Sequence, residues 1–387
     1  MAAETAHALE LLDRMVAFAT VSACSNLDLI RFVEQYLSQE GVSSHLCYDE
    51  TGERANLHAL VGPAVDGGVV LNGHTDVVPV DGQRWTSDPF RLTERGGRLY
   101  GRGAVDMKGF LACMLAAVPL WKQMPLKRPI HISMCYDEEI GGFGAPGLIE
   151  DMAQTVPRPS VAIVGEPTEM RIVTGHKGAF EMRTEIIGLE AHASDPRKGA
   201  NAISFAAQLI GYLENRARIL AATPDPTSGF EPPFTTISVG TVHGGTARNV
   251  IPGYCALDWE LRFIPGTDAE AVMADIHDYV SSTLLPDLNR QYPGADIRMR
   301  TEAKVPALDD RNSHEAVALL TEITGLNKTD VVPFGTDAGH FSDAGISTVV
   351  FGPGSIDQAH KPDEYIELSE LGRCMAFLGK LGDRLAR

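Results

Sequence analysis

The sequence has 387 residues, more than one ordinary hydrophobic core accommodates, which predicts two domains. Its 44% hydrophobic and 22% charged residues are typical of a globular protein and exclude a disordered chain. The formal net charge of -18, without any basic stripe, argues against binding to nucleic acid or to an anionic membrane surface.

Cysteine usage and the N-terminal residues predict the cellular compartment. Six cysteines occur without a CxxC pair, so we expect reduced thiols in the cytoplasm and neither a disulfide framework nor thiolate-bound zinc. The N-terminus carries acids early and lacks a basic segment before a long apolar core, so no signal peptide is expected. The longest apolar run, residues 110–121, is too short to span a bilayer and predicts a buried helix.

The first part of the chain alternates between helical and extended patterns. Apolar residues at helical spacing predict helices over 4–20 and 27–40, and the second ends at Gly41, which suits a left-handed C-cap. A further helix is expected over about 108–122. Strands are expected at 43–48, 56–61, 68–72, 130–136 and 160–166. This alternation predicts an α/β sheet.

From about residue 178 the pattern changes to strand, helix, strand, strand, helix, strand. The strands are expected at 179–188, 235–242, 255–264 and 295–301, and the helices at 201–220 and 268–284. That order is the ferredoxin-like βαββαβ unit. We therefore expect a small domain over 178–297, inserted into a discontinuous domain over 1–177 and 298–387. The last part returns to α/β character, with helices at 313–325, 337–344 and 368–386 and strands near 331–334 and 347–352.

Acids or histidine recur where predicted strands end. The stretch GHTD places His74 and Asp76 at one exit, and side chains two residues apart on an extended chain point the same way. Comparable positions hold Asp106, the run Asp137, Glu138 and Glu139, Glu166 and, after a late strand, His360. Ligand sites of open α/β sheets lie at such carboxyl ends, so we expect these groups to converge. Each acid alone fits a solvated turn equally well.

Several carboxylates at one end of a sheet repel one another, so cations must hold them together. Oxygen and imidazole ligands without thiolate suit zinc, manganese or cobalt. Two divalent cations would balance the ligand set of Asp106, Glu139 and Glu166 with neutral His74 and His360. One carboxylate must stay off the metals to move protons, and the adjacent Glu138 and Glu139 could divide these two tasks.

Five stretches, in this order and spacing, resemble the dinuclear zinc aminoacylase/carboxypeptidase family: GHTDVVPV, LYGRGAVDMKG, DEEIGG, VGEPT and GPGSIDQAHKPDEY. The resemblance covers essentially the whole chain. It implies an α/β, mixed-sheet metallopeptidase-like catalytic domain and an inserted ferredoxin-like domain for dimerisation and for covering the site. Residues 84–103 and 355–365 are most similar to the acetylornithine deacetylase branch, whereas 244–253 follow a motif found across the family.

The resemblance also implies a role for each matching residue near the metals. Two divalent ions, zinc first and cobalt or manganese as alternatives, would be held by the pair His74 and Glu166, the pair Glu139 and His360, and the bridge Asp106. Asp76 would orient the His74 ring, and Glu138 would be the general base. A cis peptide bond is expected directly after Asp106.

The activity implied is hydrolysis of the amide bond of an N-acyl-L-amino acid, with N2-acetyl-L-ornithine and arginine biosynthesis as the first expectation. His192 would reach from the inserted domain into a site, its own or a partner's, and stabilise the oxyanion. Arg262 would grip the substrate α-carboxylate bidentately, with Asn249 close by. Gly354 and residues 335–340 would line the pocket.

Other substrates and other classes of protein remain open. The same chemistry would serve a succinyl-diaminopimelate desuccinylase, an N-acetylcitrulline deacetylase, a general aminoacylase or a dipeptidase. A succinyl tail needs a further cation, which the sequence does not identify. An inactive scaffold relative would have lost ligands or the base, and a di-metal phosphatase would need other motifs. The expected partners are the small-molecule substrate and a second copy of this chain.

Overall fold

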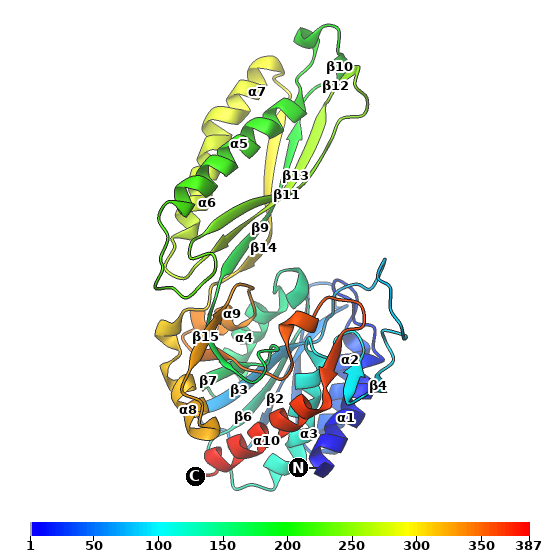
Figure 1. Cartoon of the computed structure of the whole chain (residues 1–387), viewed down its shortest axis with the longest axis vertical. Coiled ribbons are helices and arrows are strands. Elements are labelled where there is room, and N and C mark those ends of the chain that lie inside the picture. The colour runs from blue at the N-terminus through cyan, green and yellow to red at the C-terminus, as the bar shows by residue number, and fades with distance from the viewer. Residues whose placement is uncertain (1) are drawn as a thin grey trace. The chain divides into compact units, whose positions relative to one another are not determined.

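The computed structural model describes residues 2–387 and divides the chain into two compact units (Figure 1). The first unit extends to His176 and resumes at Leu308, and the second covers Lys177–Ala307. Residues 298–307 therefore fall in the inserted unit, because its last strand continues to Val305. Within the described residues there is no helix with the length and apolarity that crossing a membrane requires.

The first unit is built on an eight-stranded mixed sheet in the order β1-β2-β6-β3-β7-β16-β8-β15. Its strands are β1 (Ser44–Tyr48), β2 (Ala55–Val61), β3 (Gly68–His74), β6 (Ile130–Cys135), β7 (Pro159–Val164), β8 (Ile172–His176), β15 (Thr329–Val332) and β16 (Ser347–Val350). The four neighbours β6, β3, β7 and β16 run parallel. Their carboxyl ends consequently lie at the same edge of the sheet.

Helices cover both faces of this sheet. One face packs on α1 (Ala2–Val16), α2 (Leu27–Gln39), α3 (Lys108–Lys122), α8 (His314–Thr324) and α10 (Leu368–Leu385). The other packs on α4 (Gly144–Thr155) and α9 (Ala338–Asp343). Alternation along β3 separates the two cores: Val69 and Leu71 face the first layer, whereas Val70 faces the second. A small sheet joins β17 (Tyr365–Glu367), β5 (Arg98–Tyr100) and β4 (Thr93–Arg95).

The second unit is a four-stranded antiparallel sheet with helices on one face (Figure 1). The strands, in spatial order, are β11 (Thr236–Gly244), β13 (Tyr254–Phe263), β9 (Gly178–Ile187) and β14 (Asp296–Val305). The helices are α5 (Ala202–Ala221), α6 (Ala269–Tyr279) and α7 (Leu285–Gln291), the last two joined by η3 (Val280–Leu284). A short ribbon pairs β10 (Ala191–His192) with β12 (Val250–Ile251). The expected α/β fold with a βαββαβ insertion is confirmed.

A buried histidine on the sheet makes the stability of the first unit sensitive to acid. His131 in β6 is 1% exposed, and neither ring nitrogen has a hydrogen-bond partner among residues 2–387. Burial, followed by the nearby His58, lowers its pKa to about 4. Between about pH 6.5 and pH 4 the unfolded chain therefore binds a proton that the folded state excludes, so stability falls as the pH falls through this window.

Between about pH 7.5 and pH 5, we expect the free energy of unfolding to fall by about 2 kcal/mol less in His131→Leu than in the wild type. Leucine fills a similar volume and cannot take up a proton in either state. Urea unfolding at the two pH values measures the difference. The matched control is His243→Ala, because His243 is exposed and should leave the pH dependence as it is. An unchanged pH dependence in His131→Leu would contradict the prediction.

Candidate metal centre

Three neighbouring parallel strands end beside one another, and each leads into residues expected in the site. Strand β3 ends at His74 itself, two residues later than the sequence predicted. Strand β6 leads into the short helix η1 (Glu138–Ile140), and β7 leads to Glu166. Asp106 precedes α3, and the peptide bond that follows Asp106 is cis, as expected.

The two expected histidine ligands each face two carboxylates. The Nε2 atom of His74 lies 3.1 Å from Asp106 Oδ1 and 3.5 Å from Glu166 Oε1. The Nε2 atom of His360 lies 3.2 Å from Asp106 Oδ2 and 2.9 Å from Glu139 Oε2. Asp106 thus presents one oxygen to each imidazole. The five residues predicted as ligands converge as two groups that share Asp106.

The electrostatics of this cluster require positive charge. Burial, and then Asp106, raise the pKa of Glu166 well above its usual value and that of Glu139 to about 7. Although burial opposes it, His360 and His74 hold the pKa of Asp106 below its usual range. Contact with Asp106 and Glu139 in turn raises the pKa of His360 to about 10. Positive charge beside these carboxylates would lower the cost of burying them together, and divalent cations would supply it.

One carboxylate oxygen gives a more direct indication that a cation fits. Oε1 of Glu139 is buried and has no hydrogen-bond partner within the described chain. An orphaned buried anion oxygen is costly, and a metal ion would satisfy it. With imidazole and carboxylate donors and no cysteine among the cluster's ligand atoms, the donor set suits zinc-class ions.

Asp76 connects two of the strand exits. Its Oδ1 accepts a hydrogen bond from the backbone N–H of Glu138 at 3.1 Å, and its Oδ2 accepts one from Glu139 at 3.3 Å. Ser22 donates to Oδ2 at 2.7 Å. The Nδ1 atom of His74 lies 2.9 Å from the backbone oxygen of Asp76 and 3.4 Å from its carboxylate. Asp76 therefore fixes the backbone of both glutamates as well as the imidazole.

Glu138 lies beside the cluster, and its neighbours there differ in part from those of Glu139. One of its carboxylate oxygens is within 4.8 Å of ligand atoms of His74 and Glu166. Burial raises its pKa well above the usual value, and the charges of Glu166 and Asp337 add to this effect. A raised pKa makes this carboxylate a stronger base toward a proton from water.

A buried ion pair behind the cluster escaped the sequence analysis. The side chains of Arg102 and Glu364 are 1% exposed, and Arg102 Nη1 donates to Glu364 Oε2 at 2.7 Å. Glu364 Oε1 accepts from the backbone N–H of Asp106 at 3.2 Å. Arg102 Nη2 donates to the Gln83 amide oxygen at 2.6 Å, and the Gln83 amide donates to the His360 carbonyl at 3.0 Å. The pair thereby links the backbones of two predicted ligands.

Asp337 is a second residue whose contribution the sequence did not specify, although 335–340 were expected to line the pocket. It is buried, and its Oδ2 accepts a hydrogen bond from the Cys135 thiol at 2.6 Å. Burial raises the pKa of Asp337 to about 6.

Gly354, also expected near the substrate, has φ +87°, and a Cβ there would lie 2.4 Å from a methyl of Val105. Glycine is required at this position for steric reasons.

The other predicted residues belong to the second unit and lie at two ends of its sheet. His192 is exposed on β10 opposite Val250. The backbone N–H of Ala193, which follows His192, donates a hydrogen bond to the carbonyl of Asn249 at 3.0 Å. His192 and Asn249 are thus neighbours, whereas the sequence led us to expect Asn249 close to Arg262. Arg262 in β13 is paired with the first residues of β9. The ribbon of β10 and β12 lies beyond the other end of β9, so roughly 25 Å along the strand separates Arg262 from His192. Two hydrogen bonds of 2.9 Å to Glu260 occupy one edge of its guanidinium.

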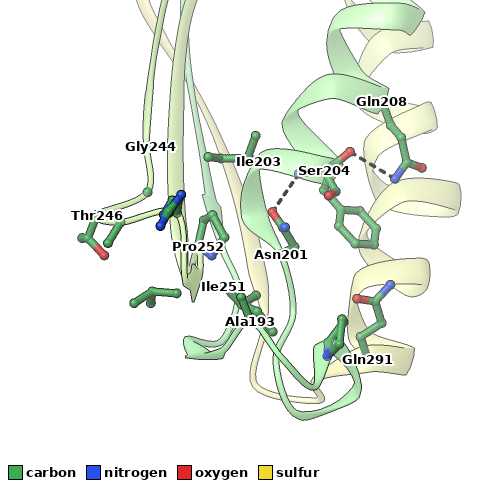
Figure 2. Close-up of a pocket in the computed structure, with 16 residues that line it drawn as sticks. Ala193, Asn201, Ile203, Ser204, Gln208, Gly244, Thr246, Ile251, Pro252 and Gln291 are labelled. Atoms are coloured by element: carbon green, nitrogen blue, oxygen red, sulfur yellow. Dashed lines mark hydrogen bonds between the residues drawn. The ribbon is translucent and has the colours of Figure 1, made fainter.

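A cavity of about 780 Å³ lies next to the ribbon of β10 and β12, which includes His192 and directly follows Asn249 (Figure 2). The residues directly after these two line it. So do a polar row, formed by Asn201 at the N-cap of α5 with Ser204 and Gln208 on α5, and Gln291 on α7. Figure 2 shows this row connected by hydrogen bonds: Ser204 N–H donates to Asn201 Oδ1 at 3.1 Å, and Gln208 Nε2 donates to the Ser204 carbonyl at 3.3 Å.

Comparison with known proteins identifies relatives along nearly the full chain. The sequence model of peptidase family M20/M25/M40 matches residues 70–384. A protein of Myxococcus xanthus named acetylornithine deacetylase is 38% identical over 374 residues, with 95% of each chain covered. One of the same name from Proteus mirabilis is 36% identical over 384 residues, with 96% of this chain and 95% of the relative covered. The Bacillus subtilis YXEP protein, a dinuclear metal binding peptidase from the M20 family, has a TM-score of 0.64 at 17% identity, covering 99% of this chain and 98% of its own.

Proposed function

This chain belongs to peptidase family M20/M25/M40 and is a metal-dependent amide hydrolase, and we propose that its substrate is an N-acyl-L-amino acid, N2-acetyl-L-ornithine before others. The observation that carries the proposal is the carboxylate of Asp106 shared between His74 and His360. It occurs in a chain whose relatives of 34–38% identity are named acetylornithine deacetylase. The products would be L-ornithine and acetate, which would place the reaction in cytoplasmic arginine biosynthesis.

We assign the cluster to two divalent cations, zinc before cobalt or manganese. One would be held by His74 and Glu166 and the other by Glu139 and His360, with Asp106 shared between them. When bound, the cations would supply Lewis acidity toward the amide carbonyl and lower the pKa of a water molecule. Asp76 holds the ends of β3 and β6 in the positions that this ligand set requires.

Glu138 is the group that we assign to proton transfer. It is close to the ligand atoms of His74 and Glu166 and is not among the contacts of His360. Its carboxylate would accept a proton from the attacking water, and the resulting acid would pass it to the leaving amine. The raised pKa supports the first of these steps, and the hydrogen bond from its backbone to Asp76 fixes its position.

His192 and Arg262 would act on opposite sides of the substrate. His192 would donate a hydrogen bond to the tetrahedral oxyanion, with Asn249 beside it, and Arg262 would bind the α-carboxylate through the edge that Glu260 leaves. An acetylated amino acid cannot span the roughly 25 Å along β13 that separate these residues in one chain. The proposal therefore pairs Arg262 of one subunit with His192 of the partner subunit in a homodimer.

Replacing His192 by alanine should lower kcat by about 10²–10³-fold and change KM much less, because the lost hydrogen bond would form only in the transition state. Steady-state kinetics on the best substrate give both constants. Ser194→Ala is a suitable control. Ser194 is close to His192 and contacts only one of its ring nitrogens, Nδ1. A rise in KM with kcat unchanged would rule out the oxyanion role.

Mixing inactive subunits tests whether His192 acts across a dimer. His192→Ala and Glu138→Ala chains, unfolded together and refolded, should regain activity at a fraction of sites, because a heterodimer has one site with both groups intact. Each variant refolded alone should stay inactive. Absence of recovery, with mixed dimers demonstrated by differential tags, would place His192 in the site of its own chain.

A substrate panel tests the proposed function as a whole. We expect kcat/KM to be highest for N2-acetyl-L-ornithine, measured against N-succinyl-diaminopimelate, N-acetylcitrulline, N-acetylmethionine and a dipeptide, with zinc or cobalt added. A higher value for another member of the panel would keep the reaction class and replace the substrate. Hydrolysis of none of them at full metal loading would favour the scaffold alternative.

A further inference from the structure

A second group of metal-ligating side chains lies outside the proposed active centre. His45 on β1 and His58 on β2 are directly paired across the two antiparallel strands and so share one face of the sheet. Helix α4 covers this face and contributes Asp151. None of these three residues, which we call the α4 cluster, is a predicted ligand of the dinuclear site.

Both imidazoles of the α4 cluster are aimed at one carboxylate oxygen. Asp151 Oδ2 lies 2.7 Å from His58 Nε2 and 3.3 Å from His45 Nε2, and the three ligand atoms lie within 4.8 Å of one another. Ligand atoms around a tetrahedral zinc ion with bonds of about 2.0–2.2 Å lie about 3.3 Å apart. The contact to His45 already has this spacing. The contact to His58 has hydrogen-bond length and would lengthen on metal entry.

Charge and exposure of the α4 cluster suit an ion that exchanges with solvent. The side chain of His58 is 2% exposed, and its Nε2 atom is directed at Asp151. The side chain of His45 is 51% exposed and that of Asp151 is 23% exposed. A fourth ligand could therefore be water. Two imidazoles and a carboxylate are donors that zinc, nickel and copper accept, whereas calcium and magnesium prefer oxygen alone.

We propose that His45, His58 and Asp151 bind a third divalent transition-metal ion, zinc before nickel or copper, at the edge of the sheet in the first unit. The ion would join β1, the outermost strand, to β2 and to α4. It would form three metal bonds, in place of the single close contact between His58 and Asp151 that the structure has. The Thr155 hydroxyl also lies near His58, 3.3 Å from its Nε2 atom. The site would stabilise the edge strand and the helix that follows Glu138–Ile140.

The test counts zinc on the full-length protein and its variants. Equilibrium dialysis against buffered zinc, followed by emission spectroscopy, should give one zinc ion fewer per chain for His45→Ala than for the wild type. His45 is exposed, so its removal should not disturb the core, and the control His243→Ala removes another exposed histidine. Because the result is a difference between variants, it does not depend on how many ions the dinuclear site holds or on the substrate.

A second variant and a second measurement complete the test. Asp151→Asn keeps the shape of the side chain and should also bind one zinc ion fewer. Zinc above the concentration that saturates the other sites should raise the Tm of the wild type and of His243→Ala, but not that of His45→Ala. Equal zinc content in the wild type and His45→Ala would overturn the proposal and leave a hydrogen-bonded His–Asp pair. So would the same loss in His243→Ala, which would show unspecific binding to surface histidines.

Discussion

Glu138→Ala should retain its metal ions and lose about 10²–10⁴-fold in kcat, because it removes the proposed proton carrier without touching a proposed ligand. Glu138 is half-buried beside the cluster, and partial desolvation there raises its pKa well above the usual value. Alanine cannot take a proton from water or return one to the leaving amine. Metal content by emission spectroscopy and kcat on the best substrate of the panel are the two measurements.

The neighbouring glutamate provides the matched control for Glu138→Ala. Glu139 faces His360 at 2.9 Å, so Glu139→Ala should lower metal content as well as activity, and excess metal should restore part of the loss. Two adjacent residues of the same type are then distinguished by metal binding alone. Turnover of Glu138→Ala within a few-fold of the wild type, or metal loss like that of Glu139→Ala, would show that the two roles are assigned wrongly.

Asp106→Asn should weaken binding of both metal ions and lower activity by more than about 10³-fold, because one carboxylate serves both halves of the cluster. Its two oxygens lie 3.1 Å and 3.2 Å from the imidazoles of His74 and His360. An asparagine amide offers one oxygen and no charge, so it cannot replace the carboxylate on both sides. Metal titration of the chelator-treated protein gives the affinities, and urea unfolding verifies that the variant folds.

Asp337→Asn is the comparison for Asp106→Asn, since Asp337 is also a buried aspartate near the cluster. Its carboxylate accepts a hydrogen bond from the Cys135 thiol and makes no ion pair with the imidazoles of His74 and His360. We therefore expect Asp337→Asn to retain both metal ions. Wild-type affinity for two ions in Asp106→Asn would remove Asp106 as the shared ligand and with it the dinuclear arrangement.

The sequence was sufficient for features that depend on residues close together in the chain. Helix α3 was predicted over 108–122 and is observed over Lys108–Lys122, because its continuous apolar run is buried almost throughout. The βαββαβ order of the insertion followed from the switch between strand and helix periods. His74, Glu139 and Glu166 also converge, because the parallel strands β3, β6 and β7 bring their carboxyl ends to the same edge whatever lies between them in sequence.

Short and exposed elements were missed for the opposite reason. Strands β4 and β5 have three residues each and β10 and β12 have two, so no period can be read from them. Their existence depends on partners, as in the pairing of β5 with β17 from the end of the chain. The inserted unit extends to Ala307 because β14 pairs with β9 as far as Val305, which its own sequence pattern did not show.

By itself the sequence determined the fold class and the family and predicted the ligands, since strand exits, periodicity and ordered motifs are local properties of the chain. Only the tertiary structure decided which groups support and surround those ligands. Arg102 meets Glu364 across 262 positions, and His58 meets Asp151 across 93. Such pairs form because packing of the whole sheet and its helices brings their elements together, and no spacing along the chain encodes that distance.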